Sequence, residues 1–390
     1  MSLSTPADAF LPFAKPSIGD EEIAEVSACL RSGWITTGPR VQRFEQALRD
    51  YFGGDREVLV LANATAGLHL ALLALDLRPG DEVITTPLTF AATLNMIVAA
   101  GGRPVLVDIV PGTYNLDPDA LESVRSRRTR AVVPVHFAGR PADLAGIYDF
   151  ANRHGLRVIE DAAQAIGAEY GGERLGAFGD VQVFSFHPNK NMTTGEGGCV
   201  VTADRVLARA VSVMRFHGID REAWNRYAKV GSALYDVVAP GFKYNMMDLQ
   251  AALGIHQLPK LAAFNERRSE LAARYWDLLC RCPQLTLPLP PDPRHRHVWN
   301  LYTPLIDPQS GIGRDVFVDQ MKARNIGVGL HYQAIHLHSY YRDRFGFRLG
   351  DYPEAEKVSA ATVSLPLFPD MTLDDQDRVV AAVREILECR

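Results

Sequence analysis

The sequence predicts an α/β protein with a mostly parallel, doubly wound sheet and a smaller C-terminal α+β domain. From Val58 onward, short apolar runs rich in β-branched residues alternate with longer amphipathic stretches, as in repeated βα units. The runs are almost continuously hydrophobic, which is expected of strands that helices cover on both faces. A chain of 390 residues also exceeds the length at which one core usually divides. We therefore expect a large domain over 1–250 and a small domain over 251–390.

The expected elements follow these runs in chain order. Strands are predicted at 58–61, 82–86, 104–108, 131–135, 157–161, 181–186 and 199–202, with helices at 65–75 and 90–100 after the first two. Near 240–245 the alternation stops, and apolar periodicity predicts one long helix over 247–265 and a second over 267–280. The proline-rich segment 287–293 marks a connection, and further helices are expected from about 314 and about 373.

Composition and charge exclude several classes of protein. With 47% hydrophobic residues and a net charge of -5, the chain is typical of a globular protein that lacks the basic surface needed for nucleic acid or an anionic membrane. No apolar run reaches the roughly 18 residues of a membrane span, and the first residues lack a signal-peptide pattern, so we expect a cytoplasmic protein. The cysteines have no zinc or redox spacing and are expected to be reduced and mostly structural: Cys29, Cys199, Cys280, Cys282 and Cys389.

Glycine motifs for nucleotide binding are missing from the sequence. It contains no P-loop, and no turn between a strand and a helix supplies the G-x-G-x-x-G dinucleotide fingerprint. In open α/β sheets, ligands bind at the carboxyl ends of the strands. Residues that directly follow the predicted strands are therefore the candidates for chemistry.

Asp161 ends the predicted strand 157–161 and is expected at the carboxyl edge of the sheet. Aspartate is a preferred N-cap residue, so one interpretation is a cap for the helix that follows. The functional interpretation is an ion pair with a protonated pyridine nitrogen, because a nearby negative charge raises the pKa of that nitrogen. The residue alone leaves both interpretations open.

Lys190 lies in the segment 185–198, SFHPNKNMTTGEGG, between two predicted strands. A single lysine in a loop is usually a solvated surface residue. Here strands fix the loop at both ends over the sheet edge, which favours a positioned amine. A lysine amine attacks carbonyl groups only when unprotonated, and partial burial lowers its pKa toward that state.

A helix N-terminus is expected after the first strand. In the segment 62–70, ANATAGLHL, Thr65 and Ala66 offer backbone N–H groups and a hydroxyl to an anion such as phosphate. A capped turn without a ligand is the alternative. Ser185 supplies another hydroxyl at a strand end, and Phe90 is placed to stack on a flat ring. An acid, an amine, a phosphate cradle and an aromatic ring together match the groups of pyridoxal 5'-phosphate (PLP).

Longer motifs resemble one known family, the sugar aminotransferases of the DegT/StrS type, from about Phe10 to Leu387. The resemblance rests on SGWITTGP, ATAGLHLAL, TFAATLN, VHFAGRPADL, VIEDAAQAIGA, SFHPNKN, TTGEGG, GFKYNMMDLQAALG, IGVGLHY and SLPLFPDMT. It implies the fold of type I PLP enzymes and the conversion of a keto group on a nucleotide-linked sugar into an amine. It also implies a homodimer with shared active sites, and L-glutamate and 2-oxoglutarate as the second substrate pair.

The resemblance also implies roles for individual residues. Lys190 corresponds to the lysine that binds the PLP aldehyde, and Asp161 to the partner of the ring nitrogen. Gln164 corresponds to the residue that contacts the ring near its phenolic oxygen. The remaining positions are Thr65, Ala66 and Ser185 for the phosphate, Asn245 for the phosphate of the neighbouring subunit, Phe90 for ring stacking, and Thr37, His331 and Tyr332 as candidate substrate contacts.

Within the family, FLPFAKPSIG, TLNMI and GFKYN are similar to the branch that makes UDP-linked 4-amino-4-deoxy-L-arabinose for lipid A modification of lipopolysaccharide. We therefore expect a UDP-linked 4-keto sugar as substrate. However, Phe90 stands where that branch often has tryptophan, and the segment 331–345 differs where relatives recognise their sugar. A GDP-linked, dTDP-linked or 3-keto sugar is an open alternative.

Other interpretations are also open at this point. Sugar dehydratases of the same family carry histidine at the position of Lys190, so the lysine argues against dehydration. A lysine-dependent aldolase without cofactor, or a binding protein without turnover, are alternatives from other classes. No metal site is expected, because the cluster of His331, His336 and His338 lacks a carboxylate at ligand spacing. The segment 294–297, RHRH, is expected to form a solvated positive patch.

Overall fold

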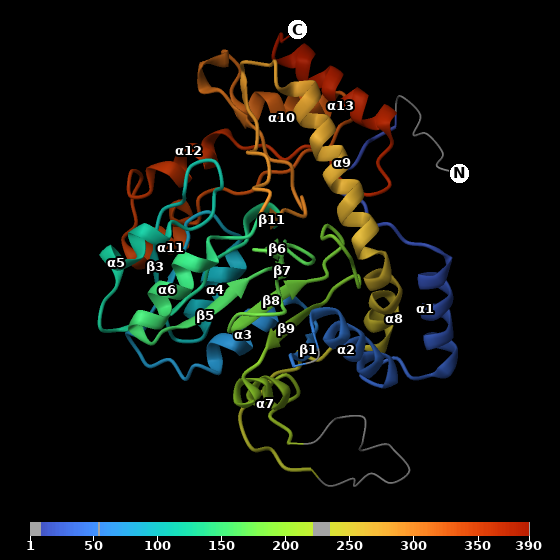
Figure 1. The fold of residues 1–390 in the computed structure, drawn as a ribbon, viewed down its shortest axis with the longest axis vertical. Helices are drawn as coiled ribbons and strands as arrows, with labels where there is room; N and C mark the ends of the chain where they lie inside the picture. The colour runs from blue at the N-terminus through green and yellow to red at the C-terminus, as the bar shows by residue number, and fades with distance from the viewer. Residues whose placement is uncertain (1–8, 54, 221–234, 390) are drawn as a thin grey trace.

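The computed structural model describes residues 9–53, 55–220 and 235–389. Its central feature is a seven-stranded sheet in the order β1-β9-β8-β5-β4-β2-β3, in the lower body of Figure 1. The strands from β8 to β3 are parallel, whereas β9 runs antiparallel to both of its neighbours. Parallel neighbours usually need a helical crossover, and the segment 186–197 between β8 and β9 contains no helix. The prediction of a mostly parallel sheet is confirmed.

The predicted strands of this sheet are present, with the largest shift at β4, which was expected to reach residue 135 and ends at Val132. The sheet consists of β1 Glu57–Leu61, β2 Glu82–Thr85, β3 Arg103–Leu106, β4 Thr129–Val132, β5 Arg157–Asp161, β8 Val181–Ser185 and β9 Gly198–Thr202. Shorter strands pair as β6 Glu169–Tyr170 with β7 Glu173–Arg174 and β11 His295–Arg296, and as β10 Leu285–Thr286 with β12 Leu305–Ile306.

Helices surround the sheet and build the upper part of the molecule in Figure 1. The α-helices are α1 Asp20–Ser32, α2 Pro39–Phe52, α3 Ala64–Leu73, α4 Ala91–Ala99, α5 Leu121–Val124, α6 Leu144–His154, α7 Arg205–Met214, α8 Asp248–Gln257, α9 Leu261–Leu279, α10 Arg314–Ala323, α11 Ser339–Phe345, α12 Pro353–Ala361 and α13 Leu373–Ile386. Single 3-10 turns lie at Pro118–Ala120, Phe137–Gly139, Leu258–Lys260, Pro308–Ser310 and Ile335–Leu337. Among the described residues, no helix has both the length and the apolar character needed to cross a bilayer.

Alternation along the strands buries both faces of the sheet. In β1, Val58 and Val60 pack with α2 in one hydrophobic cluster, whereas Leu59 and Leu61 pack with α3 in another. Successive side chains of a strand point to opposite faces, so one continuous apolar run fills two helix–sheet interfaces. This arrangement confirms the doubly wound organisation and leaves the strand ends as the place for polar residues.

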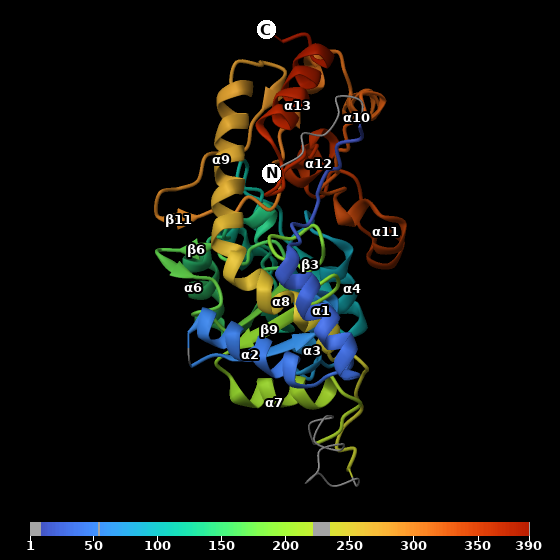
Figure 2. The same cartoon turned by 90° about the vertical axis from the view of Figure 1, so that its right-hand side faces the viewer.

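The prediction of one helix over 247–265 and another over 267–280 is wrong in its boundary. Helix α8 ends at Gln257, the turn Leu258–Lys260 follows, and α9 continues to Leu279. Pro259 causes the break because it has no backbone N–H and its ring clashes with the preceding helical turn. Figure 2 shows α9 rising from α8, beside the sheet, to the C-terminal elements.

A separate hydrophobic cluster fills the C-terminal part. It joins side chains between Leu271 and Cys389 from α9, α10 and α13, together with Leu11 from the N-terminal segment. Whether this cluster marks a small domain that starts at residue 251 stays a prediction. The same cluster contains a disulfide between Cys282 and Cys389, whose Cα atoms lie 5.2 Å apart. The expectation of reduced cysteines is therefore wrong for this pair. The two cysteines are 107 positions apart in the sequence, so no local spacing indicates their contact.

Candidate active site

Asp161 ends β5 with a side chain that is only 6% exposed. Its Oδ2 accepts a hydrogen bond of 2.8 Å from the Thr93 hydroxyl of α4, and its Oδ1 accepts one of 3.2 Å from the backbone N–H of Ala163. Burial raises the pKa of Asp161, while these hydrogen bonds and the charge of Lys190 act in the opposite direction. No α-helix follows Asp161 directly, so the helix-cap interpretation is wrong. A buried carboxylate with two neutral donors fits a cationic ligand group.

Lys190 is partly buried in the segment between β8 and β9. Burial lowers the pKa of its amine to about 8, while the charge of Asp161 raises it. Burial and the charge of Lys190 also lower the pKa of His331 to about 4. Each of these pKa shifts includes the effect of a charge in this group, so Lys190, Asp161 and His331 lie close together at one site. They come from three distant segments of the chain. An amine with such a pKa is partly unprotonated near neutral pH and therefore able to attack a carbonyl group.

Gln164 links the turn after β5 to the C-terminal part of the chain. Its Oε1 accepts a 2.6 Å hydrogen bond from the backbone N–H of Ala138, and its Nε2 donates a 2.6 Å hydrogen bond to the Tyr332 hydroxyl. The Tyr332 ring lies 6.1 Å from the ring of Phe90, measured between centroids. Phe90 precedes α4 and is 60% exposed. Tyr332 therefore contacts both Gln164 and Phe90, which lie far from it in the sequence.

The expected phosphate cradle lies at the start of α3. Asn63 is the N-cap of α3, and its Oδ1 accepts a 2.8 Å hydrogen bond from the backbone N–H of Ala66. The Ala66 N–H, a predicted phosphate donor, therefore already has a partner within the chain. Thr65 lies in the first turn and is partly buried. Ser185 of β8 pairs in register with Gly198 of β9. A side chain at Gly198 would clash with the backbone of Ala64, so glycine lets β9 approach the start of α3. Whether Thr65, Ala66 and Ser185 bind a phosphate stays a prediction. Asn63 was not among the expected residues, although asparagine before an apolar helix is a recognisable N-cap.

Asn245 and Thr37 lie against each other within this chain. Asn245 Nδ2 donates to Thr37 Oγ1 at 2.5 Å, and the Thr37 hydroxyl donates to the Met246 carbonyl at 2.6 Å. The backbone of Asn245 forms an isolated antiparallel β-bridge with Leu61, at the end of β1 and close to the start of α3. Its Oδ1 is buried without a hydrogen-bond partner among the described residues. The prediction that Asn245 reaches a neighbouring subunit is not tested by one chain.

The histidines and the RHRH segment have partners of their own. His331 Nδ1 lies 2.7 Å from the Ser364 hydroxyl, and His336 Nε2 lies 2.8 Å from a Glu356 oxygen. In the described part of the chain, no three His, Cys, Asp or Glu side chains gather as a metal site.

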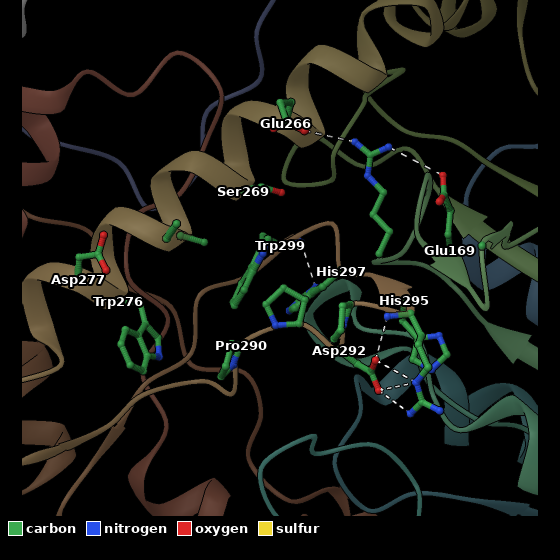
Figure 3. Close-up of a pocket in the computed structure, with 17 residues that line it drawn as sticks. Glu169, Glu266, Ser269, Trp276, Asp277, Pro290, Asp292, His295, His297 and Trp299 are labelled. Atoms are coloured by element: carbon green, nitrogen blue, oxygen red, sulfur yellow. Dashed lines mark hydrogen bonds and ion pairs between the residues drawn. The ribbon is translucent and has the colours of Figure 1, made fainter.

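The expected positive patch at 294–297 is wrong. Arg294 pairs with Asp292 at 2.7 Å, and Arg296 lies between Glu169 and Glu266, at 3.9 and 3.7 Å. The three acidic partners are seen in Figure 3. His297 is buried, and burial holds its pKa well below the usual value. These residues line a cavity of about 660 Å³ between α9 and the segment 290–299, which contains none of the predicted site residues.

A partly unprotonated amine and a buried carboxylate at one sheet edge, beside a helix N-terminus, define a PLP-dependent enzyme of fold type I. The chain belongs to the DegT/DnrJ/EryC1/StrS aminotransferase family, whose sequence profile matches residues 16–384. It is therefore an aminotransferase that acts on sugars and uses PLP as cofactor. Family membership removes the cofactor-free aldolase from the alternatives.

Individual relatives are similar to this chain over nearly its whole length. The spore coat polysaccharide biosynthesis protein SpsC of Bacillus subtilis is 45% identical over 381 residues, which cover 97% of both chains. Helicobacter pylori PseC, an aminotransferase involved in the biosynthesis of pseudoaminic acid, is 29% identical with a TM-score of 0.89, covering 97% of this chain and 99% of PseC. The PLP form of Spr1654 from Streptococcus pneumoniae is 29% identical with a TM-score of 0.88 and the same coverage.

Proposed function

We propose that this aminotransferase moves the amino group of L-glutamate to the 4-keto carbon of a UDP-linked sugar, with Lys190 and Asp161 as its catalytic residues. The observation that carries the proposal is the placement of buried Asp161 at the end of β5 and of Lys190 on the loop after the neighbouring strand β8, at one edge of the sheet. When bound, PLP supplies an aldehyde that exchanges amines and a protonated ring that withdraws electrons. Each group of the cofactor has a matching residue in this site.

Lys190 has two tasks in this proposal. Its unprotonated Nζ binds the cofactor between turnovers, which its lowered pKa favours. Once the amino donor has displaced it, the same Nζ takes the proton from the donor's α-carbon and later returns one to the sugar carbon. Its position beside Asp161 and His331 keeps the amine partly buried.

Asp161 holds the ring nitrogen protonated through its charge. Thr93 and Ala163 fix both carboxylate oxygens, so the charge stays directed at one place. Gln164 is proposed to contact the phenolic oxygen of the ring, and Phe90 to stack on its face. The proposed phosphate contacts are Thr65, Ala66 and Ser185, with Asn245 from a second subunit. For Ala66, the phosphate would have to replace Asn63 Oδ1 as the acceptor of its N–H.

A homodimer with shared active sites is part of the proposal. Large apolar side chains are exposed on α1, where Ile23 and Leu30 are each 56% exposed, and at the start of the adjoining α8, where Met247 is 43% exposed. Phe90 is exposed beside the active site as well. Exposed apolar side chains on two adjoining elements support an interface there. A two-fold interface would place the same residues on both subunits.

The proposed sugar is a UDP-linked 4-keto sugar, with Thr37, His331 and Tyr332 among its contacts. The sequence resemblance to the arabinose branch supports this choice. SpsC, in spore coat polysaccharide biosynthesis, and PseC, in pseudoaminic acid biosynthesis, support an amino sugar product. Lipopolysaccharide, through lipid A modification, is the proposed destination.

A substrate panel tests this function. Purified enzyme with PLP and L-glutamate is given UDP-, GDP- and dTDP-linked 4-keto sugars, and 2-oxoglutarate and amino sugar are measured by mass spectrometry. We expect the highest kcat/KM with a UDP-linked sugar and no turnover by Lys190→Ala. Preference for another carrier would contradict the sugar assignment, whereas turnover by Lys190→Ala would contradict the catalytic assignment.

A further inference from the structure

Three buried asparagines surround the loop that carries Lys190. Asn191 follows Lys190 directly, Asn265 lies on α9, and Asn300 lies in the segment after β11. Their exposed fractions are 2%, 2% and 3%. Buried amides are retained only where they find hydrogen-bond partners, so their contacts show which parts of the chain they join.

Asn191 is the centre of these contacts. Its Nδ2 donates to Asn265 Oδ1 at 2.6 Å and to the Val298 carbonyl at 2.8 Å, and its Oδ1 accepts from Asn300 Nδ2 at 2.9 Å. Asn300 Nδ2 also donates to the Asn189 carbonyl at 3.1 Å. The residues on both sides of Lys190 are therefore fixed to the same amide.

Asn265 extends the contacts to the other half of the active site. Its Nδ2 donates to the Ile166 carbonyl at 3.1 Å, in the turn that continues from Asp161 and Gln164. Gly167, with φ +85°, leaves the space that the Asn265 side chain fills. One side chain of α9 thus touches both the loop of Lys190 and the turn after Asp161.

Arg268 anchors this arrangement one turn further along α9. It is 2% exposed, and its Nη1 donates to the carbonyls of Trp299, Asn300 and Leu367 at 3.3, 3.3 and 2.8 Å. Residues three apart on a helix share a face, so Arg268 holds the segment 299–300 against the side of α9 that carries Asn265. The cluster of Asn191, Asn265 and Asn300 is therefore attached to the helix α9 rather than to another loop.

We propose that Asn191, Asn265 and Asn300 are positioning residues that hold the Lys190 loop and the Asp161 turn at a fixed separation. This inference rests on the proposed catalytic role of Lys190. The segment 186–197 has no helix of its own, and loops without such restraints are mobile. A displacement of about 1 Å in a reacting group is enough to cost roughly a hundredfold in rate.

Asn265→Ala tests the proposal by removing the contacts to both halves of the site. In apoprotein, the Lys190 amine is acylated with a brief pulse of acetic anhydride at a series of pH values, and modification of Lys190 is followed by mass spectrometry. A loosened loop exposes the amine to water, so the midpoint of its titration should rise by about one pH unit. The charged or titratable groups coupled to Lys190 are Asp161 on β5 and His331, and both are unchanged in the variant.

Gln376→Ala is the matched control. Gln376 is fully buried and its Nε2 donates to the Leu271 carbonyl at 2.7 Å, in the C-terminal cluster away from Lys190. Its loss should lower Tm and leave the titration of Lys190 unchanged. Asn265→Ser is the milder second variant, used if the alanine variant does not fold.

Turnover gives the second measurement. With PLP bound, we expect Asn265→Ala to reduce kcat by about 10- to 100-fold with little change in the KM for glutamate. A wild-type titration midpoint together with a Tm as low as that of the control would overturn the proposal and leave only a structural role. The titration midpoint and Tm of Asn265→Ala test the positioning role. The activity of Lys190→Ala tests the catalytic role of Lys190 separately.

Discussion

Gly198→Ala tests the close approach of β9 to the start of α3. A methyl group at this position would lie 2.6 Å from the backbone N of Ala64, 2.7 Å from the carbonyl oxygen of Phe184 and 2.9 Å from the Cα of Ala64. The atoms that it meets all belong to the backbone, so no side-chain rotation relieves the overlap. Carbon contacts are optimal near 3.5–4.0 Å, so β9 and α3 must separate by roughly 0.5–1 Å.

The expected cost has two parts. Overpacking a close-packed interior by one methyl group destabilises by about 1–3 kcal/mol, which corresponds to a Tm lower by roughly 2–10 °C. The displaced start of α3 also moves Thr65 away from Ser185. We expect the Kd for PLP to rise about tenfold, which removes about 1.4 kcal/mol of the stabilisation that the cofactor provides.

The assay compares Tm in apoprotein and in protein saturated with PLP. Gly313→Ala is the control, because Gly313 has an ordinary φ of -69° and a methyl group there meets nothing within 4 Å. It should change Tm little and leave the PLP-dependent shift intact. A Gly198→Ala protein with the wild-type Tm and the wild-type shift would refute the reasoning about the cradle.

Three further predictions concern charge and cross-linking. Asp161→Asn should fold but lose about 100-fold or more of kcat, because the amide cannot keep the ring nitrogen protonated; near-normal kcat would show that the charge is not needed. Burial lowers the pKa of Lys190 from 10.5 to about 8, so between these pH values the unfolded chain binds more protons and the stability of the apoprotein rises with pH. Lys190→Met should lose that rise in Tm, and an equal slope in both proteins would contradict the lowered pKa. Cys282→Ser should lower the free energy of unfolding by about 2–4 kcal/mol, measured in urea, because the disulfide closes a long loop; an unchanged value under oxidising conditions would mean that the cross-link does not stabilise the chain.

Residues at the strand ends could be predicted because local pattern decides where a strand stops. The apolar runs of β5 and β8 end at Asp161 and Ser185, and the glycine-rich return to β9 fixes the loop of Lys190. Each of these features lies at or within a few residues of a strand end. Because the carboxyl ends of parallel strands meet at one edge of a sheet, periodicity places them at the same edge. The fold class and the cofactor follow from that placement.

The partners of these residues could not be predicted in the same way. Thr93 bonds to Asp161 across 68 positions, Gln164 to Tyr332 across 168, and Asn191 to Asn265 across 74. Such contacts depend on how helices and strands pack in three dimensions, and no periodicity in one segment contains that information. Pro259, by contrast, is a local signal: a proline inside a helical pattern indicates a break, and the break between α8 and α9 lies there.

The pair Glu160 and Asp161 shows why packing must decide between chemically similar residues. Successive side chains of β5 point to opposite faces, so only one of the two carboxylates is able to face the site. Glu160 is fully buried on the other side, where it accepts hydrogen bonds from Tyr148 at 2.6 Å and Gln182 at 2.9 Å and lies 2.9 Å from His136 Nε2. His136 Nδ1 accepts from the Ala142 N–H, so Nε2 carries the proton that Glu160 accepts. Three protein donors thus surround Glu160, whereas two surround Asp161, and this difference favours Asp161 as the carboxylate that we propose for the cofactor.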